Sequence, residues 1–158
     1  MKFRKVAVIA AGALLATTTV FAESHGAKSP YDSQIKARKG MMNLYAVNLG
    51  VLGGMAREKI AYDAEAAQVA ADNLVALTSV NVNSLWPQGS DSASTEGTRA
   101  LPEIWSNFPD VGAKSGALKD AAAAMQGLAG ADLASLQSGM GALGGACGAC
   151  HKAYRQEQ

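Results

Sequence analysis

The stretch Cys147-Gly148-Ala149-Cys150-His151 ends seven residues before the C-terminal residue of the 158-residue chain and contains its only two cysteines. The spacing C-x-x-C-H is the attachment signature of c-type haem: two thiols form thioethers with one porphyrin, and the adjacent histidine reaches the iron. On a helix, Cys147, Cys150 and His151 lie on one face, because they are separated by three and four residues. We therefore predict one covalent haem at Cys147 and Cys150, with His151 as an iron ligand.

Two other uses of a C-x-x-C pair are less consistent with this chain. A redox disulfide of the thioredoxin-like type usually follows a strand and opens a helix, and no segment here has the pattern of a strand. A zinc site needs more ligands, and the only other histidine is His25, near the start of the mature chain. Haem attachment is the interpretation that these two comparisons favour.

Residues 1–22 are predicted to be a secretory signal peptide. Lys2, Arg4 and Lys5 precede an apolar run over residues 6–20, and small residues follow at the positions that a signal peptidase reads. The apolar run is short for a membrane span, so a cleaved signal is favoured over an uncleaved anchor. We expect no membrane attachment after cleavage.

The remaining chain is predicted to have a flexible tail at residues 23–30 and one domain at residues 31–158. Removing the three basic residues of the signal from the 14 in the chain leaves 11, against 13 acidic residues, which is a formal charge of −2. There is no excess of basic charge of the kind that nucleic-acid or anionic-membrane binding requires.

The helix-forming segments predict an all-α fold, an antiparallel four-helix bundle. Apolar periodicity and start signals give helices at about 32–55, 63–80, 110–130 and 132 to the C-terminus, with a polar loop over 81–100 and a short turn at 102–105.

The last helix carries an apolar seam that includes both cysteines. Spacings of three and four relate Leu133, Leu136, Met140, Leu143, Cys147, Cys150 and Tyr154. The cysteines thus continue the core stripe, which predicts that the haem is held in the bundle core. The stripes expected for the second and third helices are Ala66, Val69, Ala70, Leu74 and Leu77, and Leu118, Ala121, Ala122, Met125 and Leu128.

The first helix has an apolar stripe that contains one charge. Its members are Ile35, Arg38, Met42, Tyr45, Leu49 and Leu52. Arg38 either extends to solvent on its aliphatic stem or pairs with a haem propionate, and we favour the propionate because haem brings two carboxylates into this core. Met42, one turn further on, is either a core filler or a thioether ligand opposite His151. The neighbouring Met41 falls off the stripe.

These residues resemble those of the class II c-type cytochromes, the cytochrome c prime family, over almost the whole mature chain. The likeness rests on the C-terminal haem motif continued by Lys152-Ala153-Tyr154-Arg155, on Tyr62-Asp63-Ala64, on Trp86-Pro87-x-Gly89-Ser90, and on Ala100-x-Pro102-x-Ile104-Trp105. The resemblance implies a four-helix bundle, covalent haem c, His151 as the proximal ligand and a periplasmic location. The family often forms dimers, so a homodimer is an open expectation.

The resemblance also bears on the sixth position of the iron. Typical members have an apolar, non-coordinating residue four positions after an arginine of the first helix and bind NO or CO; a low-spin subgroup has methionine there. Met42 follows Arg38 by four, so the chain resembles the low-spin subgroup. This implies a single-electron carrier that serves redox partner proteins, with a five-coordinate NO- or CO-binding protein as the alternative. No distal acid or base suggests an enzyme such as a peroxidase.

The motif generates a direct prediction about covalent attachment. Because thioether bonds survive acid, the mature polypeptide extracted with acidified acetone should keep its colour and show the mass of the chain plus one haem. The measurement is mass spectrometry of the extracted protein. Loss of the haem into the acetone phase would contradict attachment through Cys147 and Cys150.

Overall fold

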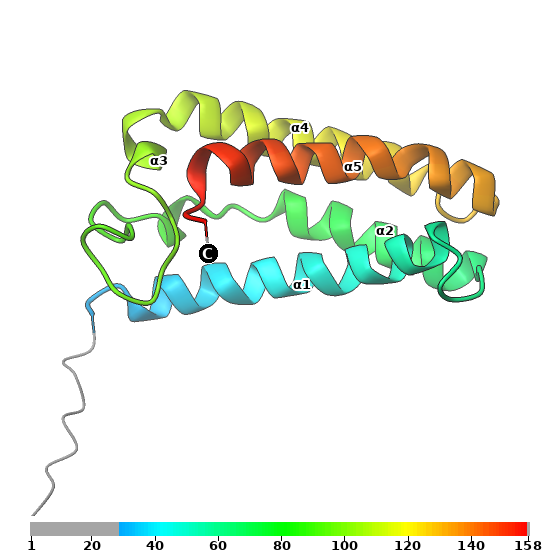
Figure 1. Ribbon diagram of the computed structural model, residues 1–158, viewed down its shortest axis with the longest axis horizontal. Helices are drawn as coiled ribbons and strands as arrows, with labels where there is room; N and C mark the ends of the chain where they lie inside the picture. The colour runs from blue at the N-terminus through cyan, green and yellow to red at the C-terminus, as the bar shows by residue number, and fades with distance from the viewer. Residues whose placement is uncertain (1–28, 158) are drawn as a thin grey trace, which may run out of the picture.

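The computed structural model describes residues 29–157; the predicted signal peptide and residues 23–28 of the predicted tail lie outside the described residues. The all-α prediction is confirmed, since the described residues form helices and no named strand (Figure 1). The elements are α1 (Asp32–Ala56), α2 (Ala64–Ser79), the 3₁₀ helix η1 (Asn83–Leu85), α3 (Glu103–Ser106), α4 (Phe108–Gln126) and α5 (Leu133–Tyr154).

Side-chain caps fix where two of the long helices begin. The Asp63 carboxylate accepts a hydrogen bond from the Ala66 amide at 2.9 Å, and the Asp132 carboxylate accepts one from the Ser135 amide at 2.7 Å. Helix α4 begins at Phe108, two residues before the predicted start, because Pro109 fits the first turn, where its missing N–H is not needed.

The four long helices run alternately up and down and lie side by side (Figure 1). Helix α1 packs against α2, α2 against α4, and α4 against α5, whereas α1 and α5 close the ring with the least extensive packing of the four pairs. The connection from α2 to α4, with η1 and α3, covers the end of the bundle where α1 begins and α5 ends (Figure 1). No helix within residues 29–157 has the length and apolar character needed to span a membrane.

The tightly packed core occupies the opposite end of the bundle. Its buried members come from the end of α1, the first half of α2, the end of α4 with the turn after it, and the first half of α5: Leu52, Met55, Ala67, Ala70, Ala71, Leu74, Ala122, Met125, Ala129, Leu136 and Leu143. Burial of this apolar surface is the main force holding the four helices together. The haem motif lies outside this cluster, toward the covered end.

Two details of the predicted stripes were wrong. Ala66 and Val69 are exposed, and α2 instead buries Ala67 and Ala71, because it lies between α1 and α4 and small side chains there allow both neighbours to approach. On α1, Ile35, Arg38 and Leu52 are buried as expected, but Met42 is 43% exposed. The reason is the sparse packing between α1 and α5 on this side of the bundle.

A charged hydrogen bond joins α4 to the last turn of α5. The Tyr154 hydroxyl donates to the Asp110 carboxylate at 2.6 Å, and Lys114 lies 3.3 Å from the same oxygen. The hydrogen bond from Tyr154 is the main cause that lowers the pKa of Asp110, and it raises the pKa of Tyr154 to about 12.

This pair predicts a pH-dependent contribution to stability. A carboxyl with a lowered folded pKa stabilises the fold above its unfolded pKa of 3.8, and the contribution disappears as the pH falls through the lower folded value. Tyr154→Phe should therefore be less stable than wild type at neutral pH and approach wild type in acid. Tyr62→Phe is the control, since Tyr62 donates to the neutral Ala129 carbonyl at 2.9 Å and its loss should not depend on pH. Guanidinium unfolding of the haem-containing proteins measures the free energy of unfolding of both variants. If Tyr154→Phe is less stable than wild type by the same amount at neutral and acid pH, the Tyr154–Asp110 hydrogen bond does not have this role.

Candidate haem site

The C-x-x-C-H residues lie in the last two turns of α5. Cys147, Cys150 and His151 are all half-buried, and both thiols are free. As predicted, their spacing within a continuous helix places them on one face. Among residues 29–157 there is no cluster of three His, Cys, Asp or Glu side chains able to hold a metal ion.

Burial shifts the pKa of each of these groups in the direction that favours its neutral form. Burial raises the pKa of both thiols, so they are neutral at physiological pH. Burial also lowers the pKa of His151, and the positive charges of Arg155 and Arg99 lower it further. The imidazole is therefore neutral and has a lone pair to offer to a metal.

The pairing of α1 with α5 sets which residues face one another across the bundle. The Gln137 side-chain amide donates to the Ala56 carbonyl at 2.9 Å and joins the end of α1 to the start of α5. Met42 lies fourteen residues before Ala56, and His151 lies fourteen residues after Gln137. Because both helices rise about 1.5 Å per residue, these equal steps of about 21 Å along antiparallel helices bring Met42 and His151 to one level.

Tyr45 supports the same register independently. Burial raises the pKa of its hydroxyl, and the nearby Cys147 group adds to the rise. The hydroxyl donates to the Leu77 carbonyl at 3.2 Å, which ties this part of α1 to α2. Tyr45 is therefore a neighbour of the attachment site that the sequence pattern had presented only as a core residue.

Arg38 lies one turn before Met42 and is 6% exposed, so the alternative in which it extends to solvent was wrong. Its guanidinium donates to the Ser90 hydroxyl at 3.0 Å and to the Ser90 carbonyl at 2.9 Å, with the Thr98 hydroxyl at 3.5 Å. Its carbon Cζ lies 4.6 Å from the centre of a Trp86 ring.

The charge of Arg38 has no carboxylate partner among residues 29–157. Burial lowers the pKa of its guanidinium, yet an arginine stays protonated at any physiological pH. A buried unpaired cation is costly, and an anion close by would remove that cost. Three of the five N–H groups are used in the hydrogen bonds above, which leaves two for such an anion.

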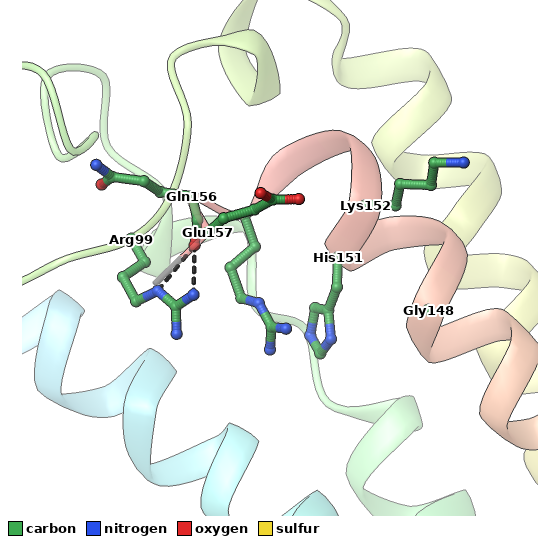
Figure 2. Close-up of a pocket in the computed structure, with 7 residues that line it drawn as sticks. Arg99, Gly148, His151, Lys152, Gln156 and Glu157 are labelled. Carbon is green, nitrogen blue, oxygen red and sulfur yellow. Dashed lines mark hydrogen bonds between the residues drawn. The ribbon is translucent and has the colours of Figure 1, made fainter.

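Further cations surround His151 on the other side of the site. A cavity of about 300 Å³ is lined by Arg99, Gly148, His151, Lys152, Arg155, Gln156 and Glu157 (Figure 2). In Figure 2 the His151 ring and the Arg99 guanidinium project to one side of the α5 backbone, and Lys152 points away from them. The sequence reasoning missed Arg99 and Arg155; Arg155 stands one turn after His151 and could have been found, but Arg99 lies in a loop.

The residues present fit a covalently attached haem. Two neutral thiols and a neutral imidazole share one face of α5, a thioether lies at the level of the imidazole on α1, and a buried cation lacks an anion. At Gly144 and Gly148 a Cβ atom would meet nothing within 4 Å, so the α5 backbone on both sides of Cys147 can be approached closely.

The match to known proteins decides the family. The family model described as Cytochrome C' matches residues 33–155. The chain belongs to the cytochrome c′ family. Cytochromes of this family carry one covalent haem c, and that is the cofactor of this chain.

Individual relatives agree with this assignment. Cytochrome c-554 of Cereibacter sphaeroides is 50% identical over 126 residues, which are 80% of this chain and 82% of the relative. The solved structure of cytochrome c′ from Rhodobacter Spheriodes has a TM-score of 0.80 at 34% identity and covers 82% of this chain and 100% of that chain. The solved structure of a carbon-monoxide-bound variant of cytochrome c′ from Alcaligenes xylosoxidans has a TM-score of 0.70 at 27% identity. The match covers 82% of this chain and 98% of that chain.

The unpaired charge of Arg38 generates a prediction about the redox potential. A nearby cation disfavours ferric iron, so Arg38→Leu should lower the midpoint potential by a few tens of millivolts, corresponding to on the order of 1 kcal/mol of charge interaction. If the guanidinium also pairs with a propionate, the pKa of a redox-linked ionisation should rise. Lys39→Leu is the control, because Lys39 is an exposed cation on the same helix. Spectroelectrochemical titration measures both variants, and equal potentials for Arg38→Leu and wild type at all pH values would reject the propionate role.

Proposed function

We propose that this cytochrome is a periplasmic single-electron carrier whose haem iron is held by His151 and Met42. The observation that supports this most is the register of α1 and α5, which brings the Met42 thioether to the level of the His151 imidazole. With haem bound, His151 on α5 and Met42 on α1 would hold the iron from two helices, and the haem would supply a one-electron couple whose potential these ligands tune.

Each residue has a distinct role in this proposal. Cys147 and Cys150 hold the porphyrin covalently and fix its edge to α5. His151, neutral because of burial and its cationic neighbours, ligates the iron from the same helix. Met42 supplies a soft thioether that favours the ferrous state and raises the potential. Arg38 pairs with a propionate. The bound haem supplies the one-electron couple.

A second function, binding of NO or CO at an open or displaceable sixth position, is favoured by one feature of Met42. The residue is 43% exposed, so its side chain is not fixed by surrounding packing as Leu52 is. The Alcaligenes xylosoxidans relative binds carbon monoxide in a variant form. In the gas-binding case Met42 lies beside the iron without a lasting bond.

We further propose the partners, the location and the oligomeric state of this chain. In this proposal the chain delivers electrons to redox partner proteins and acts as a carrier and not as an enzyme, which its membership of the cytochrome c′ family supports. We place it in the periplasm after removal of residues 1–22. Exposed apolar residues on α1 and α2, namely Leu44, Val47 and Val69, support a homodimer.

Substitution of the two adjacent methionines tests the ligand assignment. Met42→Ala should convert a low-spin spectrum to a high-spin one, abolish the weak ferric charge-transfer band of methionine ligation, and increase the rate of CO binding by orders of magnitude. Met41→Ala should leave all three unchanged, because Met41 is the same residue type one position away on another side of α1. Absorption spectroscopy and stopped-flow mixing with CO provide the measurements.

The wild-type spectrum already separates the two functions. An electron carrier with Met42 bound is low-spin in both oxidation states and reacts slowly with CO. A high-spin wild type that binds CO rapidly at neutral pH would refute the electron-carrier proposal and support gas binding.

A further inference from the structure

The segment from Trp86 to Leu101, in the connection between α2 and α4, makes polar contacts with both helices that carry the proposed iron ligands. It reaches α1 at one end and the last turn of α5 at the other. These two helices pack against each other less than any other neighbouring pair of long helices. The segment therefore contributes a link between them that their own contact does not supply.

At α1 the link is made through Arg38. The guanidinium is held by the Ser90 hydroxyl and carbonyl and lies over Trp86. Ser90 is fully buried, and its hydroxyl in turn donates to the Pro87 carbonyl at 2.7 Å. The indole of Trp105 donates to the Trp86 carbonyl at 3.0 Å, which fixes the segment from the α3 side.

At α5 the link is made mainly through the backbone. The Leu101 amide donates to the Tyr154 carbonyl at 3.0 Å, and the Gln156 amide donates to the Arg99 carbonyl at 2.9 Å. Ala100 and Arg155 thereby form an isolated antiparallel bridge. The Arg99 side chain adds a bond from Nε to the Gln156 carbonyl at 2.9 Å (Figure 2).

Both ends of the segment lie next to the proposed ligands. Arg38 precedes Met42 by one helical turn, and Tyr154 follows His151 by three residues. A rigid helical turn transmits a displacement of Arg38 to Met42, and the bridge at Ala100 holds the end of α5 in the same way.

We infer that residues 86–101 act as a strap that sets the separation of α1 and α5, with Ser90 as a positioning residue that acts through Arg38 on the bond between Met42 and the iron. This inference rests on the proposed function, in which Met42 is the sixth ligand. Ser90 touches neither the iron nor its ligands. It fixes where α1 stands relative to α5, and a weak, half-exposed thioether ligand depends on that position.

The test removes the Ser90 hydroxyl in the full haem-containing protein. Ser90→Ala should raise the rate of CO binding roughly tenfold, the effect expected for one lost hydrogen bond to a charged group, and should weaken the charge-transfer band of methionine ligation. Ser90→Thr, which keeps a hydroxyl, should restore both. Ser92→Ala is the matched control, because within residues 29–157 Ser92 is hydrogen-bonded through its backbone amide alone.

A second readout does not depend on iron ligation. Spin labels at Lys39→Cys on α1 and Lys152→Cys on α5, both exposed positions, report the distance between the helices. Ser90→Ala should widen the distance distribution measured by double electron–electron resonance, and Ser92→Ala should not. Arg99→Gln, which removes the side-chain bond at the α5 end, should also widen the distance distribution. If Ser90→Ala does not accumulate, the distribution measured in Arg99→Gln tests the strap in its place.

The spectra, the CO kinetics and the spin-label distances together distinguish failure of the proposed function from failure of the strap. A wild type without a sulfur ligand refutes the proposed function, and the spin-label distances still judge the strap. A wild type with the sulfur ligand, combined with a Ser90→Ala protein that has unchanged CO kinetics and an unchanged distance distribution, overturns the strap. Faster CO binding in Ser90→Ala that Ser90→Thr reverses, together with the wider distribution, supports it.

Discussion

The antiparallel register of α1 and α5 is the constraint on which the proposed site depends. One hydrogen bond, from Gln137 to the Ala56 carbonyl, marks that register at the packed end of the bundle. Helical geometry then carries it along both helices for about 21 Å, to the level that Met42 and His151 share. A shift of α5 by one residue would turn the cysteines by about 100° around the helix axis and move them off the face they share with α1. Interhelical packing far from Cys147 and Cys150 therefore decides which α1 residue lies level with His151.

The two ends of the bundle are held together by different interactions. At one end, buried Leu, Met and Ala side chains hold the four helices together. At the other end, the α2–α4 connection, the Arg38–Ser90 contacts and the Tyr154–Asp110 bond tie the helix ends by polar interactions. The haem-attachment residues lie between these regions and are only half-buried. Such a design keeps the ligand-bearing helices in place while leaving the residues around the cofactor free of dense packing, where a haem contributes its own large apolar surface.

The family and the helices could be predicted from the sequence. The buried face of α2 and the contacts of Arg38 and Arg99 could not, for physical reasons. The Cys147–His151 motif, the Asp63 and Asp132 caps and the apolar spacing of α5 are local signals, and they gave the family and the helices. The buried face of α2 was misjudged because a run of alanines has similar hydrophobicity on every side, so only its neighbours decide which face is buried. The partners of Arg38 and the approach of Arg99 to His151 arise from loop contacts separated by more than fifty residues, which no periodicity encodes. The exposure of Met42 likewise reflects how closely α1 and α5 pack and not the order of residues along α1.

In the proposed ligation, α1 and α5 each supply one iron ligand to a haem attached through Cys147 and Cys150. X-ray absorption fine structure at the iron edge of the purified protein tests it most directly, because it distinguishes sulfur from nitrogen among the atoms bonded to the metal. Ligation by His151 and Met42 should give one sulfur and five nitrogen neighbours in both the ferric and the ferrous protein. The sulfur should be lost in Met42→Ala and kept in Met41→Ala. Five nitrogen neighbours and no sulfur in the wild type would contradict it.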